Sequence, residues 1–457
     1  MTSPEFLIPD SLASASRVPE PPKPDSLSPA SSCPYLASDF TSRRLDLDPV
    51  YARLRDEQPV SRVTMPHGGD AWLVTRYDDV RAALADPRLS RAATVGKDVP
   101  RSSPLIQHPE SLLSMDPPEH TRLRRLAAKA FSVRQVEAVR PRVQAIVDGL
   151  VDALEETGSP ADLAGGLAWP MGITVICETF GVPEEDRAAF RAWTDTMMAL
   201  TVADPTGIQA ARAELDAYLR DLIARRIAAP GDDLLSRLVT ARDGRDRLTE
   251  AELAIFAVDL LTAGHETTAN QTGNFLYTLL SRPALWDSLV EEPALVPGAV
   301  EELLRVTPLA TSVAPFSRIA VEDLEIGGAL VRAGDAVVAQ NDSANRDGTV
   351  FERPEEIDFT RAVNPHLAFG HGAHHCPAAP LARLELRTAV ATLVRRLPGL
   401  RLAVPVDEVV WQSNRVMRGV KELPVKWLRD NDSARRTPDL LPRDEVARAI
   451  NEEVKAG

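Results

Sequence analysis

The sequence predicts a mainly helical protein, with one large helical domain and a small β-rich part. Apolar residues recur at helical spacing along most of the chain. Strands are expected in only two places. One is residues 71–77, and the other is residues 324–340, where Gly327-Gly328 separates two short apolar runs. No internal repeat accompanies this pattern, which favours a single domain.

The clearest helix is expected at about residues 249–281. Thr249 and Glu252 form a capping-box pattern at its start, and Arg282-Pro283 marks its end. A helix of about thirty residues is about 50 Å long at 1.5 Å per residue, which is the width of a whole domain. The residues in its middle are therefore expected to lie in the core.

The two ends of the chain differ from the rest. Residues 1–32 are rich in Pro, Ser and Ala and have few large apolar side chains, which is typical of a disordered arm. Residues 429–457 form a charged tail, in which Pro442 could start a short surface helix. The folded domain is therefore expected to span residues 33–428.

The composition argues against several classes of protein. The net charge of -14 over 457 residues argues against nucleic acid as a partner. The N-terminus lacks a basic segment followed by an apolar one, so no signal peptide is predicted. The most apolar uncharged run, residues 163–177, is too short to span a membrane. Three cysteines lie far apart, at positions 33, 177 and 376, as in proteins of a reducing cytoplasm. We therefore expect a cytoplasmic protein.

The segment around the last cysteine, residues 369–383, reads FGHGAHHCPAAPLAR. Gly370 and Gly372 can adopt backbone angles closed to other residues, which allows a tight loop to approach a flat group. Pro377 suits the first position of a helix. Cys376 would then lie at the helix N-terminus, where the helix dipole and free N–H groups stabilise a thiolate.

Two other interpretations of this cysteine follow from the residue types alone. Most isolated cysteines behave as small buried hydrophobic residues. Zinc also favours the ligand types of His371, His374, His375 and Cys376. Ligands bunched so tightly in the sequence would need an unusual geometry, which argues against zinc.

The loop resembles the signature of the cytochrome P450 superfamily, FGxGxHxCxG followed by LAR. The matching residues are Phe369, Gly370, Gly372, His374, Cys376, Leu381, Ala382 and Arg383. Ala378 departs from the pattern, because the family usually has glycine there. The resemblance implies the cytochrome P450 fold and a haem b cofactor (iron protoporphyrin IX) with Cys376 as the axial ligand. A thiolate ligand pushes electron density towards bound oxygen and favours O–O cleavage.

The middle of the long helix carries a second motif, AGHETT at residues 263–268. The Thr267 hydroxyl can bond to the carbonyl of Ala263 and locally open the helix, and Gly264 removes a side chain where a ligand could approach. A buried Glu266 is costly unless it has a function. Alone, the motif favours a capped polar notch in a core helix over a proton relay, and the presence of the cysteine loop reverses this preference. It resembles the family's AGx[DE]T[TS] motif, which implies that Thr267 steadies dioxygen and Glu266 delivers protons.

A third pattern is Glu302 with Arg305, one helical turn apart. This spacing usually marks a solvated surface pair. The pair resembles the family's ExxR motif, and Arg361 is the candidate for the third member that the family adds to it.

A haem brings two carboxylates that need basic partners when they are buried. Residues 116–124 open a helix with His120 and Arg124 on one face, which would otherwise be read as a solvated basic face. The resemblance implies that these two residues, with Arg318 and His374, bind the propionates. The remaining expected cofactor contacts are Gly264, Phe369 and Gly370.

The resemblance also implies that electrons come from a separate ferredoxin and ferredoxin reductase, because the chain has no room for a fused flavin reductase. Basic residues could steer an acidic donor to the cysteine side. They are Arg125 and Lys129, with Arg383, Arg387, Arg395 and Arg396. We expect a monomer without nucleic-acid or membrane partners.

The family's substrate contacts correspond here to mostly apolar or small residues: Leu112, Leu113, Leu261, Ala263, Ala310, Val313 and Val416. Such a pocket suits a bulky lipophilic molecule. We expect a monooxygenase that hydroxylates or epoxidises polyketides or macrolides in antibiotic biosynthesis. A steroid, terpenoid or xenobiotic hydroxylase is the alternative. Two further classes are a peroxide-driven peroxygenase, against which Glu266 and Thr267 argue, and a silent accessory protein, against which Cys376 argues.

Overall fold

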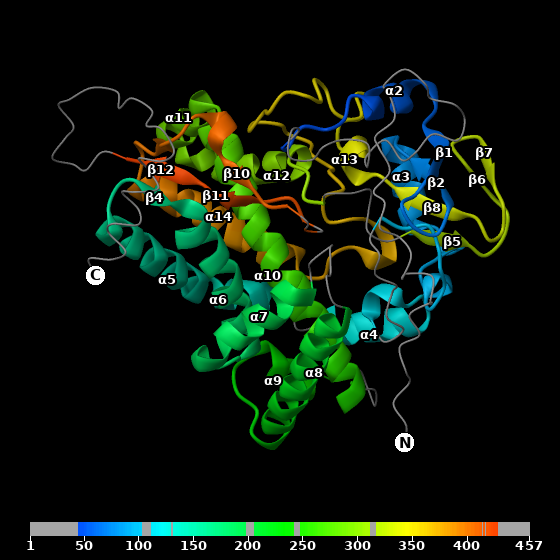
Figure 1. The fold of residues 1–457 in the computed structure, drawn as a ribbon, viewed down its shortest axis with the longest axis horizontal. Helices are drawn as coiled ribbons and strands as arrows, with labels where there is room; N and C mark the ends of the chain where they lie inside the picture. The colour runs from blue at the N-terminus through cyan, green and yellow to red at the C-terminus, as the bar shows by residue number, and fades with distance from the viewer. Residues whose placement is uncertain are drawn as a thin grey trace.

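The computed structural model describes residues 44–102, 111–128, 131–197, 205–241, 247–310, 317–413, 415 and 417–427. The arm expected at residues 1–32 and the tail expected at residues 429–457 lie outside these ranges. Most helices gather on one side of the molecule, and most strands lie on the other side together with α2, α3 and α13 (Figure 1). The mainly helical architecture with a small β-rich part is therefore confirmed.

Most of the described chain lies in helices. They are α2 (Val50–Glu57), α3 (Tyr77–Ala85), α4 (Glu119–Ala128), α5 (Val133–Thr157), α6 (Trp169–Phe180), α7 (Arg187–Met197), α8 (Pro205–Ala228), α9 (Leu234–Thr240), α10 (Glu250–Leu280), α11 (Pro283–Glu291), α12 (Val296–Val306), α13 (Asn341–Ala344) and α14 (Ala379–Arg396). Shorter 3-10 turns include η3 (Leu112–Ser114), and a π-helical segment, η4 (Ala164–Ala168), leads into α6. None of the helices in the described ranges is long and apolar enough to cross a membrane.

The long helix predicted at residues 249–281 is α10, and its capping box is present. Glu252 donates its backbone N–H to the Thr249 hydroxyl (3.2 Å), and the Thr249 N–H donates to the Glu252 carboxylate (2.8 Å). The two bonds satisfy donors that the first turn of a helix leaves free. The helix runs through the centre of the helical region (Figure 1).

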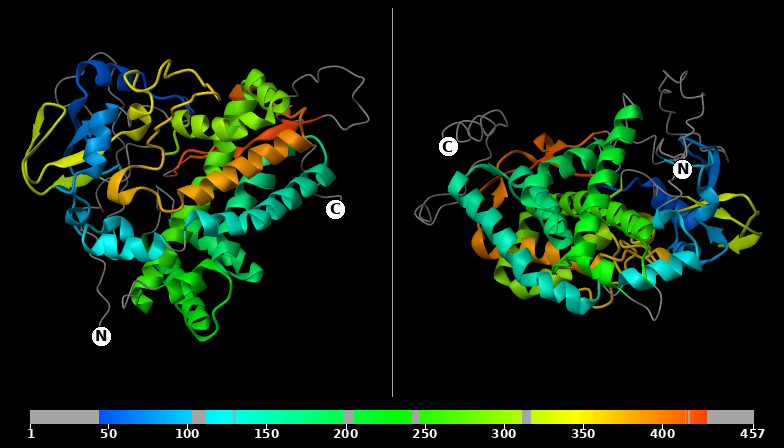
Figure 2. Two further views of the ribbon diagram at one scale, coloured as in Figure 1. Left: turned by 180° about the vertical axis from the view of Figure 1, so that it is seen from behind. Right: turned by 90° about the horizontal axis from the view of Figure 1, so that it is seen from below.

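The two ends of α10 belong to different hydrophobic clusters. Its first part, with Phe256 and Leu261 fully buried, packs in a cluster with α6, α8 and α9. Its last part, with Phe275 and Leu279 fully buried, packs in a cluster with α5, α12 and α14. Figure 2 shows α5 and α14 side by side in this second cluster. The motif at residues 263–268 therefore lies between two cores that fix α10 on either side.

Close packing of α6 against α10 depends on a glycine of α6. A Cβ atom at Gly172 would lie 2.7 Å from the carbonyl oxygen of His265, a backbone atom that cannot move aside, so this glycine is required by the helix crossing. A Cβ atom at Gly264 of α10 would lie 2.8 Å from the Cδ1 atom of Ile176. That atom is the end of a flexible side chain, which can shift to make room.

The main sheet has the strand order β1-β2-β8-β5-β3. Its strands are β1 (Val60–Thr64), β2 (Asp70–Val74), β3 (Leu89–Ser90), β5 (Arg318–Ala320) and β8 (Ala336–Ala339). Strands β2 and β8 are parallel, with Leu73 opposite Val338, whereas the other pairs are antiparallel. Smaller sheets contain β4 (Ala161–Asp162), β6 (Leu324–Ile326), β7 (Ala329–Val331), β9 (Arg401–Leu402), β10 (Val410–Trp411), β11 (Val420–Glu422) and β12 (Pro424–Lys426).

The strand predicted at residues 71–77 is shorter than expected. Strand β2 ends at Val74, and Tyr77 begins α3. The Tyr77 N–H donates to the carboxylate of Asp347 (2.9 Å), which satisfies a backbone donor at the start of this helix. The partner lies 270 residues away, so a local pattern could not reveal it. The hairpin around Gly327-Gly328 is confirmed, as β6 and β7.

The ExxR motif is fully buried. The Glu302 carboxylate accepts from Arg305 (2.7 and 2.9 Å), from Arg361 (3.1 and 3.2 Å) and from the Asn364 amide (3.0 Å). Arg305 also donates to the carbonyl oxygens of residues 345, 354 and 356. The prediction of Arg361 as the third member is therefore confirmed. This network ties α12 to the segment that leads into the cysteine loop.

Candidate active site

The cysteine loop is closed by backbone contacts. Gly370 and Gly372 have φ angles of 73° and 70°, which L side chains rarely adopt. A Cβ atom at Gly372 would also lie 2.7 Å from the carbonyl oxygen of Leu84 in α3. The Cys376 N–H donates to the carbonyl of Phe369 (2.9 Å). These contacts fix the backbone of the loop that leads to Cys376.

The helix that follows the cysteine begins later than the sequence predicted. Helix α14 starts at Ala379, and Pro377 lies in a turn, with the Ala379 N–H donating to the Cys376 carbonyl (3.4 Å). The proline at the start of the helix is Pro380. Pro377 would be equally acceptable in a turn, so the residue type alone did not distinguish the two positions.

The surroundings of the Cys376 sulfur act on its acidity in opposite directions. Burial raises the pKa of the Cys376 thiol, whereas backbone N–H groups of Ala378 and Ala379 and the positive charges of Arg124 and Arg383 lower it. The N–H groups supply the stabilisation of a thiolate that was expected from the helix N-terminus. A positive metal centre at the sulfur would favour the thiolate further.

Arg383 fixes the loop from the side. Its guanidinium lies 4.5 Å from the ring centroid of Phe369, and its Nε atom lies 2.9 Å from both carboxylate oxygens of Glu301. Arg387 also donates to Glu301 (2.7 Å). Glu301, next to the ExxR glutamate, was not singled out from the sequence. These two arginines are therefore already paired with an acid.

On α10, the Thr267 hydroxyl donates to the carbonyl of Ala263 (2.6 Å), as predicted. Thr267 is partly exposed and Ala263 is exposed, whereas the neighbouring His265 and Glu266 are buried. One face of the helix is therefore accessible exactly where the motif lies, between the two cores. That face can meet a ligand.

Glu266 is completely buried, and neither of its carboxylate oxygens has a hydrogen-bond partner among the described residues. Burial raises the pKa of Glu266 to about 7; the negative charge of Asp195 adds to this rise and Arg415 opposes it. A group with this pKa can take up and release a proton at neutral pH. The expected position of a proton-delivery residue is thus supported by its electrostatics.

Basic side chains converge near the cysteine loop. The rings of His120 on α4 and His374 lie 4.2 Å apart, and both ring nitrogens of His120 are buried without a partner within the described ranges. Burial and nearby arginines lower the pKa of His120 to about 4. Arg318 is buried, and Arg124 donates to the carbonyl of His375. The structure therefore brings the four predicted propionate residues together.

Arg91 joins this group and was missed by the sequence analysis. Burial and the positive charge of Arg318 lower the pKa of Arg91 to about 9. The backbone N–H of Arg91 donates to the carboxylate of Asp116 (2.9 Å), and its side-chain Nε donates to the carbonyl of Leu113 (2.9 Å). Strand β3 pairs with β5 so that Ser90 lies opposite Ile319, which brings Arg91 beside Arg318. Only this long-range pairing reveals the neighbourhood.

These residues fit a haem. The positive charges of two buried arginines and the ring nitrogens of His120, which have no partner among the described residues, favour an anionic ligand. Two propionate carboxylates would supply the opposite charge and acceptors for His120. These residues also fit a haem better than they fit a zinc ion. In the described part of the chain, no group of three or more His, Cys, Asp or Glu residues is arranged to hold a metal ion.

The predicted substrate residues occupy different surroundings. Leu112 is buried and Leu261 is fully buried in the hydrophobic cluster of α6 and α8. Leu113 and Ala263 are exposed, and Ala310 forms an isolated β-bridge with Met417. The other two, Val313 and Val416, lie outside the described residues.

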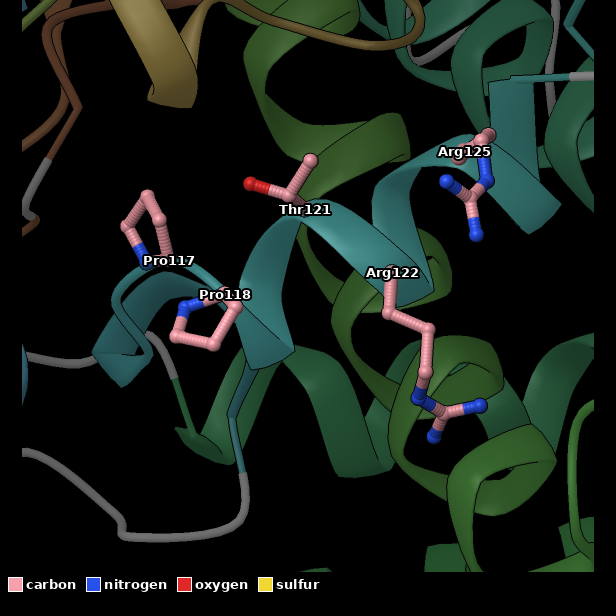
Figure 3. A pocket seen from close by; sticks show the side chains of 5 residues that line it. All are labelled: Pro117, Pro118, Thr121, Arg122 and Arg125. Atoms are coloured by element: carbon pink, nitrogen blue, oxygen red, sulfur yellow. The ribbon is translucent and has the colours of Figure 1, made fainter.

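A surface depression of about 610 Å³ lies at the start of α4, away from these residues. It is lined by Pro117, Pro118, Thr121, Arg122 and Arg125 (Figure 3). Arg122 forms a salt bridge with Glu252 of α10, and Arg125 is exposed. The depression is open and basic, unlike an enclosed substrate pocket.

A helical fold with a partly buried cysteine whose sulfur accepts backbone N–H groups, and with a hydroxyl and a carboxyl group on a central helix, defines an enzyme of the haem-thiolate class. Known proteins agree with this class. The family model "Cytochrome P450" matches residues 50–398.

Two similar curated proteins are matched over most of their length. The chain is 52% identical over 384 residues to nocardicin C N-oxygenase of Nocardia uniformis subsp. tsuyamanensis, covering 84% of this chain and 96% of that protein. It is 47% identical over 377 residues to mycinamicin IV hydroxylase/epoxidase of Micromonospora griseorubida, covering 82% and 94%.

The fold also matches solved structures. The LnmA cytochrome P450 hydroxylase from the leinamycin pathway of Streptomyces atroolivaceus S-140 is 51% identical, with a TM-score of 0.80 over 84% of this chain and 97% of that one. The chain belongs to the cytochrome P450 family. It is a cytochrome P450 monooxygenase with a haem-thiolate cofactor.

Proposed function

We propose that the protein inserts one oxygen atom from O2 into a bulky lipophilic molecule of the polyketide or macrolide type, by hydroxylation or epoxidation, during antibiotic biosynthesis. The single observation that carries the proposal is the Cys376 loop together with the Glu266–Thr267 pair on α10. The named activities of the two curated relatives support the setting, since one is a mycinamicin hydroxylase/epoxidase and the other a nocardicin N-oxygenase.

The cofactor in this proposal is haem b. Cys376 would hold the iron through its sulfur, and the backbone at Phe369 and Gly370 would lie along the porphyrin. Arg91, Arg124, Arg318, His120 and His374 would hold the propionates. Bound haem supplies the reductive activation of O2 and the transfer of oxygen to substrate. The protein contributes the ligand, the charge balance and the exclusion of water.

Thr267 and Glu266 manage protons in this proposal. The Thr267 hydroxyl donates to Ala263 in this structure, and by rotating it can donate to a ligand on the exposed face of α10 instead. Glu266 has free carboxylate oxygens and a pKa of about 7, so it can exchange a proton with water that reaches the motif.

The variant Thr267→Ala tests this role. Without the hydroxyl, electrons from NADPH should be released as hydrogen peroxide, and product per NADPH should fall several-fold. Thr272→Ala is a matched control, because Thr272 makes the same bond to the carbonyl four residues before it (2.8 Å) but is buried. Unchanged coupling in Thr267→Ala would remove Thr267 from the mechanism.

Substrate assignment needs a separate screen. The purified enzyme is expected to give the red-shifted Soret band of thiolate-ligated haem when it is reduced and exposed to carbon monoxide. A library of macrolides, other polyketides, terpenoids and steroids can then be tested for the spin-state change that follows displacement of iron-bound water. A response limited to steroids or terpenoids would replace the proposed substrate class.

The electron donor is proposed to be a ferredoxin, reduced by its reductase, which docks on α4. Arg395 pairs with Asp148 (3.1 Å) and Arg396 with Asp152 (2.6 Å) of α5, and Arg122 of α4 pairs with Glu252. Positive charge at the start of α4 around the depression in Figure 3 supports docking there. Lys129 lies outside the described residues.

Charge reversal at Arg125 tests the docking surface. Arg125→Glu should raise the KM for ferredoxin several-fold at low salt and weaken its salt dependence, because exposed charges steer association. Arg395→Glu on α14 is the control for charge reversal at another exposed arginine. Equal effects of both substitutions would place docking elsewhere.

The net charge of -14 and the widely separated cysteines support a cytoplasmic monomer.

A further inference from the structure

One carboxylate on α10 binds the turn that carries two of the expected substrate contacts. The Asp259 carboxylate accepts the Leu112 N–H (2.7 Å) and the Ser111 hydroxyl (3.1 Å to each oxygen). The Ser111 oxygen in turn accepts the Leu113 N–H (3.2 Å), which caps η3. The Asp259 side chain therefore holds the start of this turn through two donors.

The position of Asp259 on α10 connects the turn to the oxygen motif. Asp259, Ala263 and Thr267 follow each other at intervals of four residues, so they share one face of the helix. Ala263 is exposed, and Asp259 and Thr267 are partly exposed. Leu112 packs its side chain into the hydrophobic cluster beside α10, whereas Leu113 remains 38% exposed. The turn therefore lies against the same side of α10 as the catalytic motif.

We propose that Asp259 is a positioning residue that fixes the Ser111–Leu112 turn against α10 and so sets the shape and affinity of the substrate pocket. The inference rests on the proposed function, because that function makes the space beside this face of α10 a substrate pocket. Asp259 does not touch the reacting atoms. It acts through the backbone of Leu112.

The hydrogen bonds from Ser111 and Leu112 to the Asp259 carboxylate are called the anchor below. The surroundings of Asp259 make this anchor sensitive to pH. Burial raises the pKa of Asp259 to about 6, and the Leu112 N–H, the Ser111 hydroxyl and Arg212 of α8 oppose the rise. Arg212 is the charged group that acts on Asp259 within the described ranges, and it is itself bonded to Asp216 (3.2 Å). Asp259 is therefore an ionised acceptor at neutral pH and becomes protonated as the pH falls below about 6, which weakens the anchor.

Hydrogen exchange of the holoenzyme tests the anchor directly. At pH 7, Asp259→Asn should speed exchange in a peptide that covers residues 111–115 at least 10-fold, because an amide replaces the charged acceptor. Ser111→Ala should have a smaller effect, since the Leu112 N–H keeps its partner. Asp221→Asn on α8, an exposed acid next to Arg225, controls for the loss of one negative charge.

Binding of 4-phenylimidazole to the haem, followed by the shift of the Soret band, tests the effect on the pocket. Asp259→Asn should change its Kd at least 3-fold at pH 7, with the Asp221→Asn value unchanged. In the wild type, lowering the pH from 7 to 5 should move two quantities toward the values of Asp259→Asn. They are the exchange rate at residues 111–115, corrected for its intrinsic pH dependence, and the Kd for 4-phenylimidazole.

Two results would overturn the inference: equal exchange in the wild type and Asp259→Asn, or faster exchange with an unchanged Kd. Neither result bears on the haem-thiolate site. Conversely, a wild-type enzyme without the red-shifted Soret band of the reduced carbon-monoxide adduct would contradict the proposed function, whereas the exchange measurement at residues 111–115 would still report on the anchor.

Discussion

Glu302 and Glu266 are both completely buried, but their surroundings differ. Glu302 accepts hydrogen bonds from Arg305, Arg361 and Asn364. Burial acts to raise the pKa of Glu302, but the hydrogen bonds from Arg305 and the Asp358 N–H and the positive charges of Arg305 and Arg361 lower it. Glu266 has no such partner in the described part of the chain, and burial raises its pKa to about 7.

The difference separates two uses of a buried acid. A carboxylate whose charge is matched by arginines belongs to the scaffold, and removing it leaves those arginines buried without a partner. A carboxylate left without partners destabilises the protein when it is ionised, and such groups occur where a proton is exchanged. Four experiments can break or sharpen this distinction.

The largest expected effect is at Glu302. The change Glu302→Gln should cost about 3–5 kcal/mol, because the neutral amide leaves the positive charges of Arg305 and Arg361 buried and unpaired. Expression trials should then yield little soluble, haem-loaded protein, and any folded material should have a much lower Tm. A Glu302→Gln enzyme with normal haem content would show that this network is not the main support of the scaffold.

The second effect is on catalysis. Glu266→Gln should lower product formation roughly 10²-fold, which is within the range for loss of general acid catalysis. Haem content and the reduced carbon-monoxide spectrum should stay normal, since no described residue depends on this carboxylate for a hydrogen bond. Glu266→Asp, which retains the acid, should recover part of the rate. Full activity of Glu266→Gln would exclude proton delivery by Glu266.

The third effect is on stability as a function of pH. The folded-state pKa of Glu266 is raised from its ordinary value of 4.5 to about 7, so its protonated form is favoured by folding. The wild type should therefore lose stability relative to Glu266→Gln as the pH rises from about 4.5 to 7, by at most about 3 kcal/mol. Denaturant unfolding of both proteins at pH 5 and pH 8 measures this. For Glu302 the sign is reversed, because its pKa is lowered.

The smallest effect is expected at the edge of the Glu302 network. Asn364→Ala removes one hydrogen bond to a charged acceptor that retains other partners, which should cost about 1–2 kcal/mol. Val363→Ala, at a side chain that is 75% exposed, is a neighbouring control and should be close to neutral. A loss as large as that of Glu302→Gln would show that each partner of the carboxylate is indispensable.

The features predicted best from the sequence depend on residues close together in the chain. The capping box at Thr249, the bond from Thr267 to Ala263 and the pair of Glu302 with Arg305 are all within one helical turn, so spacing alone predicts them. The burial of Glu302 and Arg305 is different. Spacing favoured a solvated pair, and only the resemblance to the cytochrome P450 family indicated the correct environment.

The features that were missed depend on pairing between distant segments. Arg91 reaches Arg318 because β3 pairs with β5, more than 200 residues later in the chain. Tyr77 begins a helix instead of continuing a strand because Asp347 accepts its N–H. No local pattern contains this information.

The glycine of α6 at its crossing with α10 also limits how this enzyme can diversify. Gly172 faces the carbonyl oxygen of His265 at a distance that excludes even a methyl group. A library that mutates α6 broadly would therefore accumulate misfolded clones at position 172. Variation in substrate preference is more readily tolerated in the turn at residues 111–113, where Leu113 is exposed and side chains can change size without separating two helices.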